Sequence, residues 1–94
     1  MFRNKRYITC GVQSKISMPM QLYLWNLIDT MPEPKDYLQI FRLSVSNGKQ
    51  KIIHEQEEPE YSQEYTINIE LPLTEKVYVI DDETHSTMLL ASEY

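Results

Sequence analysis

The adjacent residues Asn47 and Gly48 constrain the fold of this chain more than any other feature, because they predict a β-hairpin. Both residue types accept the positive φ that a two-residue type I′ turn requires. The turn sets the register of two strands within Tyr37–Glu58, and it places Phe41 directly opposite His54. The sequence therefore predicts two paired strands with a defined inner and outer face.

The register divides this hairpin into two faces of different polarity. The more apolar face carries Tyr37, Phe41, Leu43, Val45, Ile52 and His54. The mixed face carries Leu38, Ile40, Arg42, Lys51, Ile53, Glu55 and Glu57. We expect a helix to pack on the first face, and Arg42 to reach Glu55 diagonally on the second. The aliphatic residues of the mixed face suggest that a partner or another chain covers it.

The segment Ser17–Met31 is the one clear helix that the sequence predicts. Its apolar residues recur at helical spacing and line one side of the helix: Met20, Leu24, Leu27, Ile28 and Met31. Ser17 can cap the first free N–H groups, and Pro19 fits the first turn. Pro32 and Pro34 end the helix, because the residue before a proline avoids the α region.

Four further segments predict strands: Tyr7–Val12, Tyr65–Leu71, Val77–Ile80 and Thr87–Ala91, the last with a short helix as the alternative. In the second of these, the residues expected to point inward are Tyr65, Ile67, Ile69 and Leu71. Cys10 is interpreted as a small buried residue of the first. The fold class expected is α+β: a mostly antiparallel sheet of about five to six strands, one helix on one face, and a single domain over residues 1–94.

The 94 residues carry a formal charge of −5, and this charge is unevenly distributed. Residues 1–16 hold four basic side chains and no acid (+4), whereas residues 17–94 hold five basic and fourteen acidic ones (−9). Such a chain is repelled by nucleic-acid backbones and by anionic membranes, so we expect neither as a partner. One cysteine allows no internal disulfide, and no apolar run is long enough to span a bilayer; we therefore expect a cytoplasmic protein.

Two clusters of ionisable residues are candidates for chemistry. His54 and Glu55 point to opposite faces of a strand, so they cannot chelate one ion, and His54 is interpreted as a boundary histidine. The turn with Asp81, Asp82 and His85 is an alternative site for a metal ion or a small ligand. On this alternative the protein could also be an enzyme that uses the turn. The ordinary role of Asp82 is to accept hydrogen bonds from the turn backbone. We predict no cofactor and no catalytic residue.

The acidic stretch after the hairpin is the predicted contact surface for a protein partner. Its candidate residues are Glu55, Glu57, Glu58, Glu60 and Tyr61. Tyrosine among carboxylates suits contact with a basic protein, and an acidic mimic of nucleic acid is one version of this idea. The same carboxylates also serve solubility, and a homodimer remains a further alternative. The function predicted is a non-catalytic interaction or regulatory module.

Five runs carry a resemblance to a known family: Arg6–Thr9, Gln21–Asp29, Asp36–Phe41, His54–Tyr61, and Val79–Asp82 with His85–Leu90. The chain resembles the small family of staphylococcal proteins of unknown function, which occur in low-GC Gram-positive bacteria and some of their mobile elements. The resemblance implies a bacterial cytosolic protein. It implies no activity, ligand or catalytic residue.

Overall fold

Six strands form one mixed sheet in the order β1-β6-β5-β2-β3-β4 in the computed structural model, which describes residues 1–94. The strands are β1 (Lys5–Ile8), β2 (Leu38–Ser46), β3 (Lys49–Gln56), β4 (Tyr61–Ile67), β5 (Glu75–Asp81) and β6 (His85–Leu90). The helices are α1 (Cys10–Lys15), α2 (Met18–Thr30) and the short 3₁₀ helix η1 (Ala91–Glu93). Only β1 and β6 pair in parallel. The α+β class with a mostly antiparallel sheet is confirmed.

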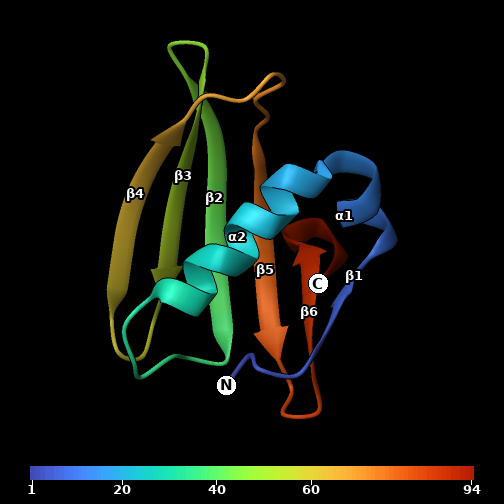
Figure 1. Ribbon diagram of the computed structural model, residues 1–94, viewed down its shortest axis with the longest axis vertical. Coiled ribbons are helices and arrows are strands. Elements are labelled where there is room, and N and C mark those ends of the chain that lie inside the picture. Colours follow the sequence, from blue (N-terminus) through green and yellow to red (C-terminus); the bar gives the residue numbers. More distant parts are fainter.

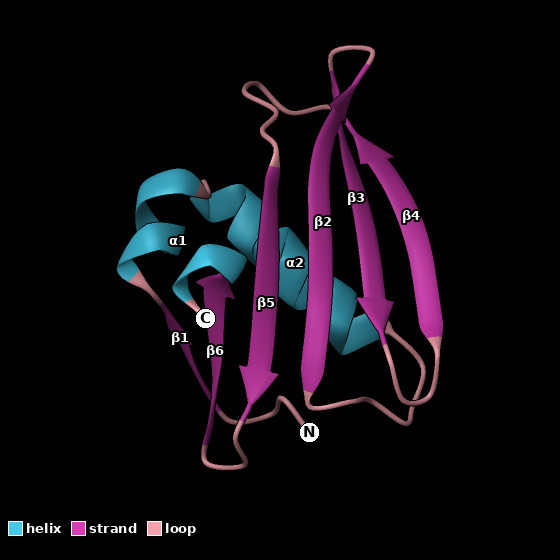
Figure 2. Cartoon of the chain, turned by 180° about the vertical axis from the view of Figure 1, so that it is seen from behind, coloured by secondary structure: helices cyan, strands magenta, loops and turns pink.

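The sheet has one covered face and one open face. Figure 1 shows α2 lying across one face of the sheet, and Figure 2 shows the opposite face with β2, β3 and β4 free of any helix. We call this second surface the open face. The apolar stripe predicted on α2 is buried at every position, with Leu24 and Ile28 fully inaccessible. Ser17 caps α2 by accepting a hydrogen bond from the N–H of Met20 (3.4 Å).

The central hairpin has the predicted register. Phe41 pairs with His54 and Ser46 with Lys49, around a turn in which Asn47 and Gly48 both have positive φ. Arg42 Nε lies 2.7 Å from Glu55 Oε1, as expected on the mixed face. Tyr37 and Val45 are exceptions on the inner face, because both are exposed. The tip of the hairpin projects beyond α2 (Figure 1), and Val45 lies two residues before the turn.

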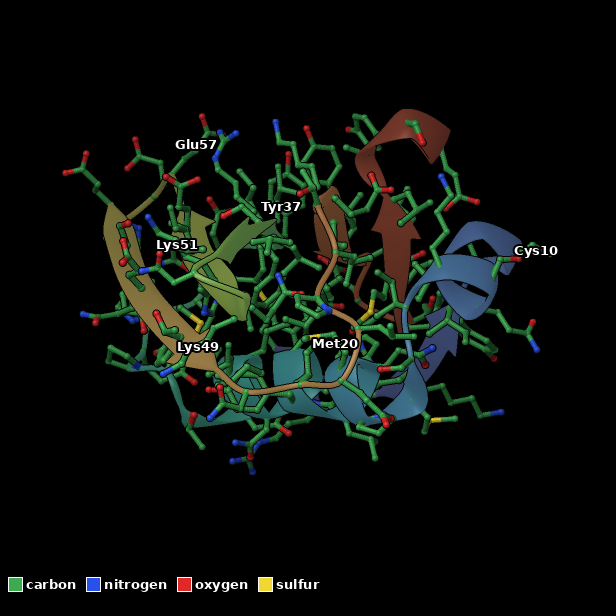
Figure 3. The ribbon with its side chains drawn as sticks, turned by 90° about the horizontal axis from the view of Figure 1, so that it is seen from above. Cys10, Met20, Tyr37, Lys49, Lys51 and Glu57 are labelled. Atoms are coloured by element: carbon green, nitrogen blue, oxygen red, sulfur yellow. The ribbon has the colours of Figure 1, made fainter.

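The strand predicted over Tyr7–Val12 is wrong in its second half. β1 ends at Ile8, and α1 begins at Cys10 because Thr9 caps it, accepting a hydrogen bond from the N–H of Val12 (3.3 Å). Val12 is buried from this helix rather than from a strand. Cys10 is exposed on the periphery of the molecule (Figure 3), so the expectation of a buried cysteine is also wrong.

The strand predicted over Tyr65–Leu71 is displaced. β4 starts at Tyr61 and ends at Ile67, because a tight turn over residues 57–60 pairs it with β3 from Gln56 onward. Leu71 lies in the following loop and is 84% exposed, contrary to the prediction. The last segment is a strand, β6, which passes into η1. None of the helices is long and apolar enough to cross a membrane.

Candidate functional site

A concave region of about 480 Å³ opens where β3 turns into β4, and we call it the acidic groove. All five residues predicted to contact a partner line it: Glu55, Glu57, Glu58, Glu60 and Tyr61. The other four lining residues are Ile40, Arg42, Gln56 and Ser62. The groove thus joins residues from β2, β3, β4 and the turn between β3 and β4.

The alternation of strand residues explains which side chains reach the groove. Ile40 pairs with Glu55, and Glu55 pairs with Ser62, so these three side chains form a row across the open face. The β3–β4 turn adds carboxylates at one end of this row. Figure 3 shows Glu57 on the side of the sheet opposite α2. The groove therefore lies on the open face, at the end of the sheet that is lowest in Figure 1.

The electrostatics of the groove are acidic. Four glutamates and one arginine line it, which gives a formal charge of −3 (one positive, four negative). Arg42 is bonded to Glu55, whereas Glu57, Glu58 and Glu60 have exposed carboxylates without an ion pair. These three charges stand within one short turn, so their fields add at the mouth of the groove. The arrangement favours cations and disfavours phosphate.

Tyr61 lies at the edge of the groove, with its ring on the helix side of the sheet, because it pairs with the inward-facing Gln56. Its ring stands edge-on to the buried ring of His54, with centroids 5.3 Å apart. Burial, with a smaller contribution from neighbouring Tyr65, raises the pKa of Tyr61 to about 12. The phenol is therefore neutral at physiological pH, and Tyr61 adds no charge to the acidic groove.

A buried polar network fixes the turn that carries the carboxylates. Gln56 Oε1 accepts hydrogen bonds from the N–H of Asp36 (2.9 Å) and from Gln39 Nε2 (2.7 Å). Gln56 Nε2 donates to the carbonyl of Pro59 (2.9 Å), inside the turn itself. His54 Nε2 closes the network on Gln39 Oε1 (2.6 Å). These buried side chains hold the turn against the segment that precedes β2.

Sequence reasoning missed the role of these glutamines. Gln39, Gln50 and Gln56 are all buried on the helix side of the sheet. The signal was present, because the predicted alternation places all three on the same face as Phe41 and His54. A polar residue repeated at core positions predicts buried hydrogen bonds to loops, since burial without partners is costly. Arg42 and Ile40 were placed on the correct face.

The alternative site at the β5–β6 turn is only partly assembled. Asp82 Oδ2 lies 3.2 Å from His85 Nε2, and Asp82 Oδ1 accepts from the backbone N–H of Thr84 and His85 as predicted. These hydrogen bonds lower the pKa of Asp82, and the bond from the N–H of His85 contributes most. Asp81 faces elsewhere and accepts from the N–H of Phe2 (2.8 Å). The structure holds no group of three His, Cys, Asp or Glu side chains placed to bind a metal ion.

Residues 5–93 match the family model described as staphylococcal protein of unknown function (DUF960). A crystal structure of a protein of unknown function from Enterococcus faecalis is similar, with a TM-score of 0.87 and 24% sequence identity, over 97% of this chain and 91% of that chain. No curated protein matches the sequence. At that identity the structural likeness shows a shared fold and carries no ligand or partner.

Proposed function

This chain belongs to the bacterial family described as staphylococcal protein of unknown function, and we propose that it is a non-catalytic module that binds a basic protein through its acidic groove. The observation that carries the proposal is the coincidence of the groove with the acidic residues predicted as a contact surface. Three unpaired carboxylates and the aliphatic side chain of Ile40 lie together there, and Tyr61 lies at the edge of the groove. Such a mixture suits lysine and arginine side chains, whose stems are apolar and whose ends are charged.

The geometry of the groove also supports recognition rather than simple solubility. Solvating carboxylates need no fixed backbone, whereas this turn is anchored by the buried Gln56 and by Asp36, whose Oδ2 accepts from the N–H of Glu58 (3.1 Å). A pre-ordered surface loses less conformational freedom on binding. We assign the interaction to the cytoplasm, where a chain without disulfides is stable in reducing conditions.

The experiment that tests this proposal is affinity capture from bacterial cytosol with two variants of equal net charge. Glu57→Lys with Glu58→Lys reverses the charge in the groove; Glu70→Lys with Glu83→Lys makes the same change at exposed positions outside it. We expect the wild type and the second variant to retain one stoichiometric partner that high salt releases, and the first variant to lose it. Equal recovery by both variants would contradict the proposal.

A second function rests on the close pair formed by Asp82 and His85. One carboxylate and one imidazole supply two ligands for a divalent cation, and solvent would have to supply the others. On this alternative, a divalent metal raises the melting temperature of the wild type but not that of Asp82→Ala. The absence of any such rise with zinc, manganese or magnesium would end it.

A further inference from the structure

Strand β4 forms one free edge of the sheet. It pairs only with β3, over seven consecutive residue pairs from Tyr61 to Ile67, and no element lies beyond it (Figures 1 and 2). In an antiparallel edge strand, alternate residues direct their backbone N–H and C=O groups away from the sheet. β4 therefore presents a row of backbone donors and acceptors to any extended chain that approaches it.

Of the devices that usually block strand addition, this edge has only one charged side chain, Glu64. Natural edges are protected by proline, by lysine, by a bulge or by a short strand. β4 contains no proline and no lysine, and its register with β3 runs without a bulge. The opposite edge, β1, has four residues and includes Lys5 and Arg6. The two edges differ, and only β4 is long and open.

Charge determines which chain can add to β4. Glu64 lies at its centre with a side chain 58% exposed, although Lys51 Nζ stands 3.6 Å away. Glu57, Glu58 and Glu60 lie in the turn that leads into it. Pairing β4 with β4 of a second copy would set two acidic edges against each other, which destabilises an antiparallel pair. The edge is complementary to a basic segment.

The two sides of β4 offer different surfaces to the added strand. Ser62, Glu64 and Thr66 face the open side, opposite Glu55, Ile53 and Lys51 of β3. Tyr61 and Tyr65 face α2, where Tyr65 stands edge-on to Tyr23 with centroids 6.5 Å apart. An incoming strand would thus place one row of side chains beside a carboxylate and the other beside tyrosine rings. Lysine suits the first row, and arginine or apolar residues suit the second.

We propose that β4 takes an extended, lysine- or arginine-bearing segment of the partner protein as a seventh strand of the sheet. This inference rests on the proposed function and specifies how the partner docks: one end of its segment lies in the acidic groove, and the rest follows the edge. Backbone hydrogen bonds then supply affinity, and the alternating surfaces supply specificity.

The test uses the full ¹⁵N-labelled chain and a synthetic nine-residue peptide of alternating lysine and valine. We expect the peptide to slow amide hydrogen exchange at alternate residues of β4 by on the order of tenfold. Two further peptides carry methyl groups on either alternate set of backbone nitrogens. The peptide methylated on the nitrogens that face β4 should give no such protection, because those nitrogens can no longer donate hydrogen bonds to the strand. Glu64→Lys should weaken binding, whereas Glu70→Lys, in the loop after β4, should not.

Other results would overturn the inference. If the peptide binds and perturbs only the residues of the acidic groove, without protecting β4, the edge is not the docking site while the groove proposal stands. If the peptide does not bind at low salt, strand addition is wrong, and the capture experiment decides the groove proposal separately. Self-association of the chain that protects β4 without peptide would identify a second copy as the occupant.

Discussion

Nε2 of His54 lies 2.6 Å from Oε1 of Gln39 in the interior of the molecule, while Nδ1 of His54 has no hydrogen-bond partner. Because a carbonyl oxygen can only accept, the proton of the neutral imidazole is on Nε2. Protonation of Nδ1 would place an unpaired charge between Phe41 and Tyr61. Burial accordingly lowers the pKa of His54 to about 4.

This pKa predicts an acid-sensitive fold. The unfolded chain binds a proton at His54 near pH 6.5, whereas the folded chain resists it down to about pH 4. The neutral His54 therefore makes its whole contribution to the free energy of unfolding above pH 6.5. This free energy should fall by about 3 kcal/mol as the pH is lowered to about 4. Urea denaturation at pH 7.5, 6, 5 and 4 measures this loss.

Two histidine variants assign this effect to His54. His54→Gln should be less stable at neutral pH but should lose little further stability between pH 6.5 and 4. His85→Gln, at the exposed turn, serves as the control and should keep the loss seen in the wild type. A wild type whose stability is constant over this range would refute a buried neutral His54.

Gln56 is predicted to be the main anchor of the acidic turn. Gln56→Leu removes hydrogen bonds to the backbone of Asp36 and Pro59 and leaves these groups without that partner. We expect a loss of about 3 kcal/mol in the free energy of unfolding, with faster amide exchange in the turn. The matched change Gln13→Leu, on the exposed side of α1, should alter stability little. Similar losses for the two variants would argue against an anchoring role.

Position 11 requires glycine because a side chain there would clash with the carboxylate of Glu93. The backbone conformation of Gly11 does not itself require glycine. A Cβ at Gly11 would lie 2.6 Å from Cδ of Glu93. The carboxylate of Glu93 accepts hydrogen bonds from Thr9 Oγ1 (2.6 Å) and from the N–H of Gly11 (3.2 Å). Gly11→Ala should therefore destabilise the wild type by displacing this carboxylate. In a Glu93→Ala background the same change should instead stabilise α1 by up to about 1 kcal/mol.

The measurement for this pair is a double-mutant cycle from thermal or urea unfolding. The predicted coupling changes the sign of the Gly11→Ala effect between the two backgrounds. Additive effects of Gly11→Ala and Glu93→Ala would show that the carboxylate does not depend on the small residue at position 11.

Asp81 and Asp82 are neighbours in sequence with different predicted roles. Burial opposes ionisation of Asp81, but hydrogen bonds from the N–H of Phe2, the N–H of Glu83 and Asn4 Nδ2 outweigh it and lower its pKa. Asp81→Ala should release the first residues of the chain and cost about 2 kcal/mol. Limited proteolysis near the N-terminus should rise in this variant and remain low in Asp82→Ala. Equal cleavage of the two variants would contradict this assignment.

The sequence was most informative where local chemistry alone decides structure. Asn47 and Gly48 define a turn without help from distant residues, so the whole register of β2 and β3 followed from them. The apolar stripe of α2 was equally readable, because burial of one helix face leaves a periodic pattern. The five residues predicted as a contact surface line one groove because they lie close together in sequence, between Glu55 and Tyr61; their role stays a prediction.

The errors arise where distant residues decide local structure. The sequence of Tyr7–Val12 alternates like that of a strand, but the chain turns into a helix after Ile8. This helix start depends on Thr9, which caps α1 and is bonded to Glu93 at the other end of the chain. The start of β4 at Tyr61 depends on a turn that is tied by Gln56 to the chain before β2. The open edge of β4 depends on strand order, which no single segment records.

The most direct test of the central claim, that the acidic groove binds a basic partner, is site-specific photo-crosslinking in bacterial cells. A benzophenone amino acid at Ser62 reports on the groove, and one at Asn26, exposed on α2, reports on the opposite side of the molecule. The account predicts one crosslinked protein from Ser62 alone, joined through a lysine- or arginine-rich segment. Identical crosslinking patterns from the two positions, or a partner joined through an acidic segment, would contradict it.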